Sequence, residues 1–142
     1  MRLTLLTAMA AAAALSALTA RAEIVQFSAA LSGAAETPAT ASAGKGTASV
    51  TLDTDTRRVT WTITYAGLSG PATMAHFHGP AAPGASAGVL IPVAGSLASP
   101  IKGEADVDDG QIGDLRAGLW YVNIHTAQNP KGEIRGQLQE AK

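Results

Sequence analysis

The sequence predicts an all-β domain, arranged as a sandwich or a barrel. Short runs in which apolar and polar residues alternate recur along the chain, and Gly, Pro, Asn and Asp separate them. The clearest run is Arg58–Tyr65, where every odd-numbered residue from Val59 onward is aliphatic or aromatic and the residues between are threonines. Beyond the N-terminal leader, no apolar pattern of helical period is long enough for a core helix.

Further strands complete the predicted domain, with turn residues between them. We expect a single helical turn at Asp114–Ala117, a hairpin turn at Asn129–Gly132 and a long surface loop at Gly79–Gly88. The aspartates of residues 106–109 lack the spacing and the distal Glu of an EF-hand, so we interpret them as a solvated turn. The further strands are expected at Val25–Leu31, Thr47–Leu52, Ala72–His78, Val89–Val93, Pro100–Ala105, Leu119–Thr126 and Glu133–Gln139.

Residues 1–22 have the pattern of a secretory signal peptide. Arg2 supplies the positive charge, an apolar Ala-rich segment runs from Leu5 to Leu18, and Ala20-Arg21-Ala22 offers small residues for cleavage before Glu23. The alternative, a membrane anchor, needs about 20 apolar residues, and this segment is shorter. We therefore expect a mature domain of residues 23–142, periplasmic or secreted, with no membrane span.

Charge and cysteine content exclude several classes of function. Removal of Arg2 and Arg21 leaves 8 basic against 11 acidic residues, a net charge of about −3, and no basic run. Nucleic acids are therefore not expected partners, because phosphate binding relies on clustered Lys and Arg. The absence of cysteine excludes disulfides, thiolate metal sites and a Cys nucleophile.

The three histidines are candidate metal ligands. His76 and His78 flank Phe77 on a predicted strand, so their side chains point the same way, with Cβ atoms roughly 6–7 Å apart. Imidazoles at that spacing can converge on one ion. His125 lies near the end of another predicted strand and completes a set of three if the two strands lie close together. Without a metal, the same histidines would be ordinary strand residues.

A methionine extends this pattern toward copper. Met74 precedes His76 by two residues, shares its face, and is the only methionine left after removal of the leader. Imidazole with a soft thioether favours copper, particularly Cu(I), over zinc or hard cations. Met74 could equally be a packing residue. The residues themselves thus leave a copper site and a structural role for His76, His78, His125 and Met74 both open.

Four segments together resemble the CHRD domain, which is named from its repeats in chordin and also occurs alone in bacterial exported proteins. The resemblance covers nearly the whole mature chain, in order. It implies that residues 23–142 form one CHRD domain. The segments are Leu68-Ser69-Gly70-Pro71, Ala75-His76-Phe77-His78-Gly79-Pro80-Ala81, Trp120-Tyr121-Val122-Asn123-Ile124-His125-Thr126 and Asn129-Pro130-Lys131-Gly132-Glu133-Ile134-Arg135-Gly136-Gln137-Leu138.

A more distant likeness connects the histidines to Cu,Zn superoxide dismutases. Those enzymes form a Greek-key β-barrel with a His-x-His pair on one strand and another copper histidine on a late strand, and His76, His78 and His125 resemble that copper half-site. The likeness implies a Greek-key β-sandwich or barrel. The further histidines and cysteines of the dismutases are absent, so no zinc site of that type is expected. Met74 would fill the fourth copper position.

Two residues are candidates for supporting roles at this site. Asn123 shares a strand face with His125 and could hydrogen-bond a ligand imidazole, although it could equally satisfy a local backbone group. Arg135 resembles the guiding arginine of the dismutases, but the simpler interpretation is a strand-face charge paired with Glu133 or with solvent. Trp120 and Tyr121 are expected in the core.

The predicted function is binding, storage or delivery of copper, as Cu(I) or Cu(II), outside the cytoplasm. A copper donor or acceptor protein and a homo-oligomer are possible partners. A fourth ligand that fills the coordination shell leaves less room for superoxide, so an enzyme is the less favoured interpretation. Two alternatives stay open: a copper-only superoxide dismutase-like enzyme, and an extracellular protein-interaction module that uses no metal.

Overall fold

The computed structural model describes residues 21–142, and the predicted signal peptide lies almost entirely outside the described residues. The domain is built from β-strands, with one 3-10 turn, η1 (Gly33–Ala35), and one short helix, α1 (Asp109–Arg116). Within residues 21–142, no helix is long and apolar enough to cross a lipid bilayer. The strands are β1 (Ile24–Ser32), β2 (Lys45–Asp53), β3 (Arg58–Ala66), β4 (Ala72–His78), β5 (Val89–Pro92), β6 (Ile101–Asp106), β7 (Tyr121–Thr126), β8 (Ile134–Gln137) and β9 (Gln139–Glu140).

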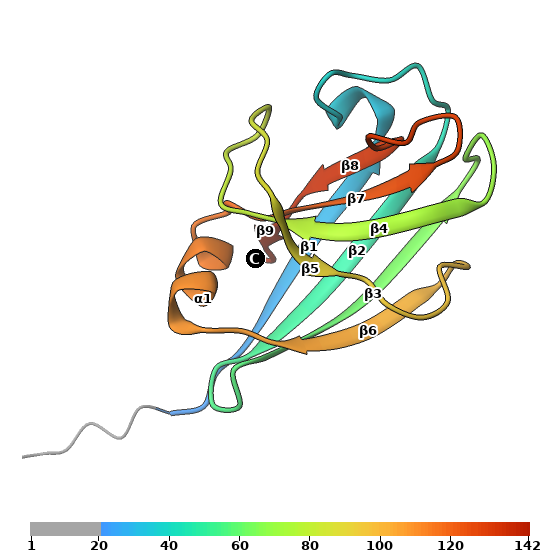
Figure 1. Ribbon diagram of the computed structural model, residues 1–142. Helices are drawn as coiled ribbons and strands as arrows, with labels where there is room; N and C mark the ends of the chain where they lie inside the picture. Colours follow the sequence, from blue (N-terminus) through green and yellow to red (C-terminus); the bar gives the residue numbers. More distant parts are fainter. Residues whose placement is uncertain (1–20) are drawn as a thin grey trace, which may run out of the picture.

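The strands form one antiparallel sheet that curls into a nearly closed barrel (Figure 1). Its order is β5-β4-β7-β8-β1-β2-β3-β6, and β9 pairs with β1. β6 pairs with β3 and β7 pairs with β4, so the β3–β4, β5–β6 and β6–β7 connections join strands that are not neighbours in the sheet. β5 and β6 are the two edge strands of this sheet. If they paired, the strand order β7-β4-β5-β6 would be that of a Greek key. The all-β prediction is confirmed.

Alternation along the strands fills the barrel with apolar side chains. On β3, Val59, Trp61 and Ile63 are buried as predicted. Phe77 from β4 lies between two indoles, with ring centroids 5.0 Å from Trp61 and 6.2 Å from Trp120. The predicted core position of Trp120 is confirmed, and Phe77 is buried to the same extent, since both are 1% exposed.

The pairing of β4 with β7 assembles the candidate site on the outer face of the barrel. Because Ala75 and Phe77 point inward, Met74, His76 and His78 point outward. The register places Met74 opposite His125, His76 opposite Asn123 and His78 opposite Tyr121. Two segments that lie 49 residues apart in the sequence therefore meet on one surface.

The acidic segment after β6 differs from its predicted form. We expected a solvated turn and a single helical turn, but Asp109–Arg116 is an α-helix of 8 residues, with Leu115 buried against the core. Asp108 caps it: its carboxylate accepts from the Gln111 N–H at 2.8 Å, and the Gln111 side chain accepts from the Asp108 N–H at 2.9 Å. This capping box stabilises a helix too short to be recognised from periodicity.

Asp108→Ala is expected to lower the free energy of unfolding by about 1 kcal/mol, because loss of an N-cap side chain leaves helix N–H groups unpaired. Chemical denaturation measures the change. Asp55→Ala, in the exposed β2–β3 turn, is the control and is expected to change stability by less than about 0.5 kcal/mol. Equal effects of the two substitutions would contradict the capping role.

Candidate metal centre

Ring nitrogens of His76, His78 and His125 meet on the outer face of β4 and β7. One nitrogen from each ring lies within 4.8 Å of the other two. The closest pair is Nδ1 of His76 and Nε2 of His125, at 3.1 Å. His78 and His125 are buried and His76 is partly exposed, so the cluster opens to solvent on the His76 side. Separations of this size allow three imidazoles to bind one ion after small side-chain rotations.

Backbone carbonyls fix the orientation of two of these rings. Nδ1 of His78 is 3.0 Å from the Ala87 carbonyl oxygen, and Nδ1 of His125 is 2.9 Å from the Pro130 carbonyl oxygen. A carbonyl oxygen only accepts hydrogen bonds, so Nδ1 must carry the proton in both rings. In each neutral ring the lone pair is then on Nε2, which faces the cluster. This arrangement of an outer carbonyl and an inner free nitrogen is typical of metal-binding histidine.

Asn123 places a further acceptor at the centre of the cluster. Its Oδ1 lies 3.0 Å from Nε2 of His78 and 3.0 Å from Nε2 of His125. With both rings neutral, two nitrogen lone pairs face an amide oxygen, and no hydrogen lies between them. Such a group of buried acceptors is unfavourable unless a positive charge is shared among them. A cation, either a proton or a metal ion, would satisfy these acceptors.

The electrostatic environment opposes the proton. Burial lowers the pKa of His125, and the neighbouring His78 adds to this, while the hydrogen bond to Pro130 acts in the opposite direction. Burial also lowers the pKa of His76, with further contributions from His125 and His78. His76 and His125 are therefore uncharged near neutral pH, which is the state in which imidazole binds a metal.

The family model of the CHRD domain matches residues 27–138, a segment that includes all three histidines. The chain belongs to the CHRD family. No curated protein and no solved structure matches it significantly. The CHRD resemblance predicted from the sequence is thus confirmed over residues 27–138.

Tyr121 of this CHRD domain is buried, as expected, but on the outer face of the barrel, and Arg135 is not at the surface. Arg135 is only 2% exposed and makes no ion pair with Glu133. Its guanidinium carbon lies 3.5 Å from the centroid of the Tyr121 ring, and its Nη2 donates to the Ala85 carbonyl at 2.7 Å. Tyr121 is buried on the outer face, with its ring stacked on His78 at 4.7 Å between centroids. A cation, a phenol and an imidazole therefore form one stack behind the cluster.

Glu36 is a residue of the site that the sequence did not reveal. It is 8% exposed and lies beside Asn123, and its Oε1 is buried without a hydrogen-bond partner. Burial raises the pKa of its carboxyl, and the charge of Arg135 and the Asn123 amide act in the opposite direction. No motif surrounds Glu36, which follows the η1 turn in a segment of small residues. Its role arises only from the way the β1–β2 connection folds over β7 and β8.

Met74 has the position expected of an accessory ligand but not a buried environment. It lies directly opposite His125 and on the same outer face as His76, and it is 43% exposed. A large exposed thioether beside a histidine cluster is available to an ion at the open side of the site. Its role as a ligand remains a prediction.

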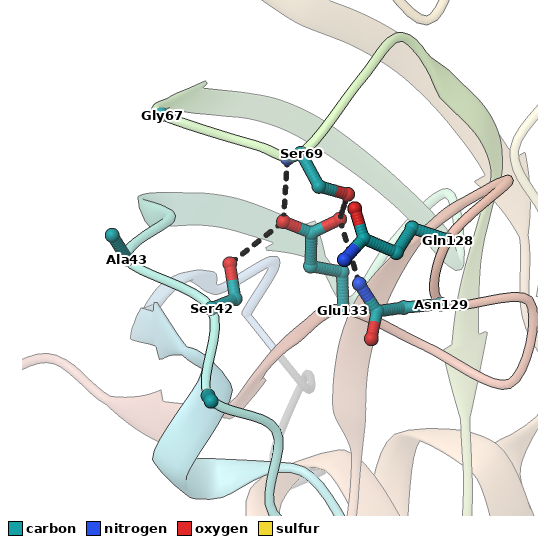
Figure 2. Close-up of a pocket in the computed structure, with 8 residues that line it drawn as sticks. Ser42, Ala43, Gly67, Ser69, Gln128, Asn129 and Glu133 are labelled. Atoms are coloured by element: carbon teal, nitrogen blue, oxygen red, sulfur yellow. Dashed lines mark hydrogen bonds between the residues drawn. The ribbon is translucent and has the colours of Figure 1, made fainter.

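A second polar cluster surrounds the buried carboxylate of Glu133, close to His125 in the sequence but on the other side of the Asn129 turn (Figure 2). One carboxylate oxygen accepts from the Ser42 hydroxyl at 2.7 Å and from the Ser69 N–H at 2.8 Å. The other accepts from the Ser69 hydroxyl at 2.6 Å and from the hydroxyl of Thr126 and the amide of Asn129. These bonds join three separate connections of the barrel.

The role of Glu133 is structural, although it lies at the floor of a hollow of about 350 Å³. Burial raises the pKa of its carboxyl, but the hydrogen bonds from Ser69, Thr126 and Ser42 outweigh burial and lower the pKa to about 2. The carboxylate is thus ionised and its acceptor capacity is already used, which leaves little for a ligand.

Gly132→Ala is expected to damage both stability and metal binding. Gly132 has φ +127°, and a Cβ there would collide with Glu36 Oε1 and lie 2.7 Å from Asn123 Nδ2. We expect a loss of at least about 2 kcal/mol in unfolding free energy and about 10-fold in copper affinity.

Gly84→Ala is the matched control: φ is +81°, but a Cβ there meets nothing within 4 Å. It is expected to cost about 1 kcal/mol and leave copper affinity unchanged. Identical copper affinities in the two variants would contradict the link between Gly132 and the site.

Proposed function

We propose that this CHRD domain is an exported copper-binding protein that stores or delivers copper. His76, His78 and His125 are the ligands and Met74 is an additional ligand on the open side. The observation that carries the proposal is the convergence of three ring nitrogens. Nε2 of His78 and of His125 are inward-facing acceptors 3.0 Å from Asn123 Oδ1, and Nδ1 of His76 lies 3.1 Å from His125 Nε2. A bound cation relieves the repulsion among them.

The composition of the site favours copper over other metals. Calcium and magnesium require mainly oxygen ligands, and the cluster is built from imidazoles. Copper(II) has the highest affinity for nitrogen sites among the divalent first-row metals, and Cu(I) is bound by imidazole together with a thioether. Met74 is the one thioether of residues 23–142 and lies opposite His125. The predicted leader, residues 1–22, supports a location where copper is handled outside the cytoplasm.

Metal analysis followed by competition titration tests the proposal. Protein expressed with its leader and purified from the periplasm is expected to contain copper, and the apo-protein is expected to take up one equivalent of Cu(I) or Cu(II). Met74→Leu is expected to weaken Cu(I) binding more than Cu(II) binding. A wild-type protein that takes up no copper under conditions in which its fold is intact would overturn the proposal and leave the interaction-module interpretation.

Superoxide turnover separates storage or delivery from a dismutase-like enzyme. Arg135, the candidate for anion guidance, is packed between Tyr121 and the Ala85 carbonyl and is 2% exposed. We therefore expect the copper-loaded protein to dismutate superoxide no faster than free copper at the same concentration. Turnover well above that control, lost in His76→Ala, would instead establish the enzyme.

A further inference from the structure

Asn123 is held in one orientation by its surroundings. It is 4% exposed, and its Nδ2 lies on the side of Glu36 and Gly132, where the buried Glu36 carboxylate has an unpartnered oxygen. An amide nitrogen beside a carboxylate is favourable, whereas an amide oxygen there would be repelled. Glu36 therefore favours the orientation in which Nδ2 faces its carboxyl group and Oδ1 faces the histidine nitrogens.

Four potential metal-donor atoms, the three ring nitrogens and Asn123 Oδ1, form a continuous arc. Along it, His76 Nδ1 is 3.1 Å from His125 Nε2, which is 3.0 Å from Asn123 Oδ1. Oδ1 is in turn 3.0 Å from His78 Nε2. Ligands about 2.0–2.1 Å from one ion are separated by about 2.9 Å when they subtend 90° and by about 3.3 Å at the tetrahedral angle. All three separations fall in that range, and without the oxygen the arc is broken between His125 and His78.

We infer that Asn123 Oδ1 is a direct ligand of the bound ion, oriented by Glu36, and that it makes the site selective for Cu(II). This inference rests on the proposed copper-binding function and names a fourth donor within it. Three nitrogen donors and one oxygen donor would suit Cu(II), whereas Cu(I) has little affinity for an amide oxygen. Met74, on the exposed side, serves the reduced ion. The oxidation state of the metal then decides which of the two side chains completes the shell.

Paired Cu(II) and Cu(I) titrations of Asn123→Leu test the inference. The substitution keeps the volume and removes the oxygen. We expect Cu(II) affinity to fall about 10- to 100-fold and the hyperfine splitting in the Cu(II) electron paramagnetic resonance spectrum to change. Cu(I) affinity is expected to change less than about threefold. Gln128→Leu, an exposed amide in the neighbouring turn, is the control and is expected to change neither. Asn123→Ser provides the same comparison if the leucine variant does not fold.

Glu36→Gln supplies the second measurement. The carboxamide can present its own N–H to Asn123 and no longer favours one amide orientation, so Cu(II) affinity is expected to fall in the same direction by a smaller factor. An unchanged Cu(II) affinity and spectrum in the folded Asn123 variants would overturn the inference while leaving the copper site intact. Failure of the wild-type protein to bind copper would instead overturn the proposed function itself.

Discussion

His125→Ala is expected to lower copper affinity by more than about 100-fold. Removal of a group that only orients a ligand already costs about 10- to 100-fold in metal affinity, and the loss of a ligand should exceed that. His125 is also the residue through which the two halves of the cluster meet, since its Nε2 lies 3.1 Å from His76 and 3.0 Å from Asn123. Competition with a chelator of known affinity measures the effect for both oxidation states.

Lys131→Ala is the control for His125→Ala, because Lys131 is exposed in the adjacent turn and faces no ligand. Its copper affinity is expected to equal that of the wild type. The His125 variant should remain folded, because Val122 and Ile124 belong to the hydrophobic core cluster and His125 does not. Copper bound by His125→Ala as tightly as by the wild type would show that the three histidines do not share an ion.

Glu133→Gln is expected to give the largest loss of stability of the substitutions considered, about 3 kcal/mol, or roughly 10 °C in Tm. The wild-type carboxylate is 0% exposed and accepts hydrogen bonds from Ser42, Ser69, Thr126 and Asn129. A carboxamide replaces one accepting oxygen by a donor, which then faces other donors. Thermal and chemical denaturation at neutral pH measure the change.

The contribution of Glu133 also depends on pH. Its pKa in the folded protein, about 2, is below the ordinary value of 4.5, so the folded state favours the ionised form. The stabilisation is therefore present above about pH 4.5 and is lost as the pH falls toward 2. The Glu133→Gln variant should lack this part of the acid sensitivity.

Glu104→Gln, in an exposed pair with Arg58, is the control for Glu133→Gln and should cost less than about 1 kcal/mol of unfolding free energy. Equal acid sensitivity in the wild type and in Glu133→Gln would contradict the low pKa.

The outer face of β7 and β8 concentrates the polar features of this CHRD domain. Every residue of β7 is buried, although every second one points away from the core. The β4–β5 loop covers this face through Ala85 and Ala87, and the β1–β2 connection covers it through Glu36. Thr37 joins the two segments by donating to the Gly84 carbonyl at 3.3 Å. The site is thus enclosed by loops on a rigid sheet, an arrangement common to binding sites.

Strand positions and the facing of side chains within a strand could be predicted from the sequence. The bounds of β4, Ala72–His78, agree with the prediction because they depend on local alternation and on the Gly and Pro residues at either end. The common face of Met74, His76 and His78 follows from the two-residue period alone. The last predicted strand, in contrast, is divided into β8 and β9 at Leu138, which is buried in the core.

Burial of the outer face was decided only by the tertiary structure. A strand such as Tyr121–Thr126 has the pattern of a half-exposed strand, and Arg135 on the next strand was likewise predicted as a strand-face charge at the surface. The actual environment of these residues depends on loops that come from residues 33–44 and 79–88, and no local pattern encodes where a loop will lie. The sequence by itself determined which residues can bind a metal. The long-range pairing of β4 with β7 determined that they meet, and the fold of the β1–β2 connection brought Glu36 beside Asn123.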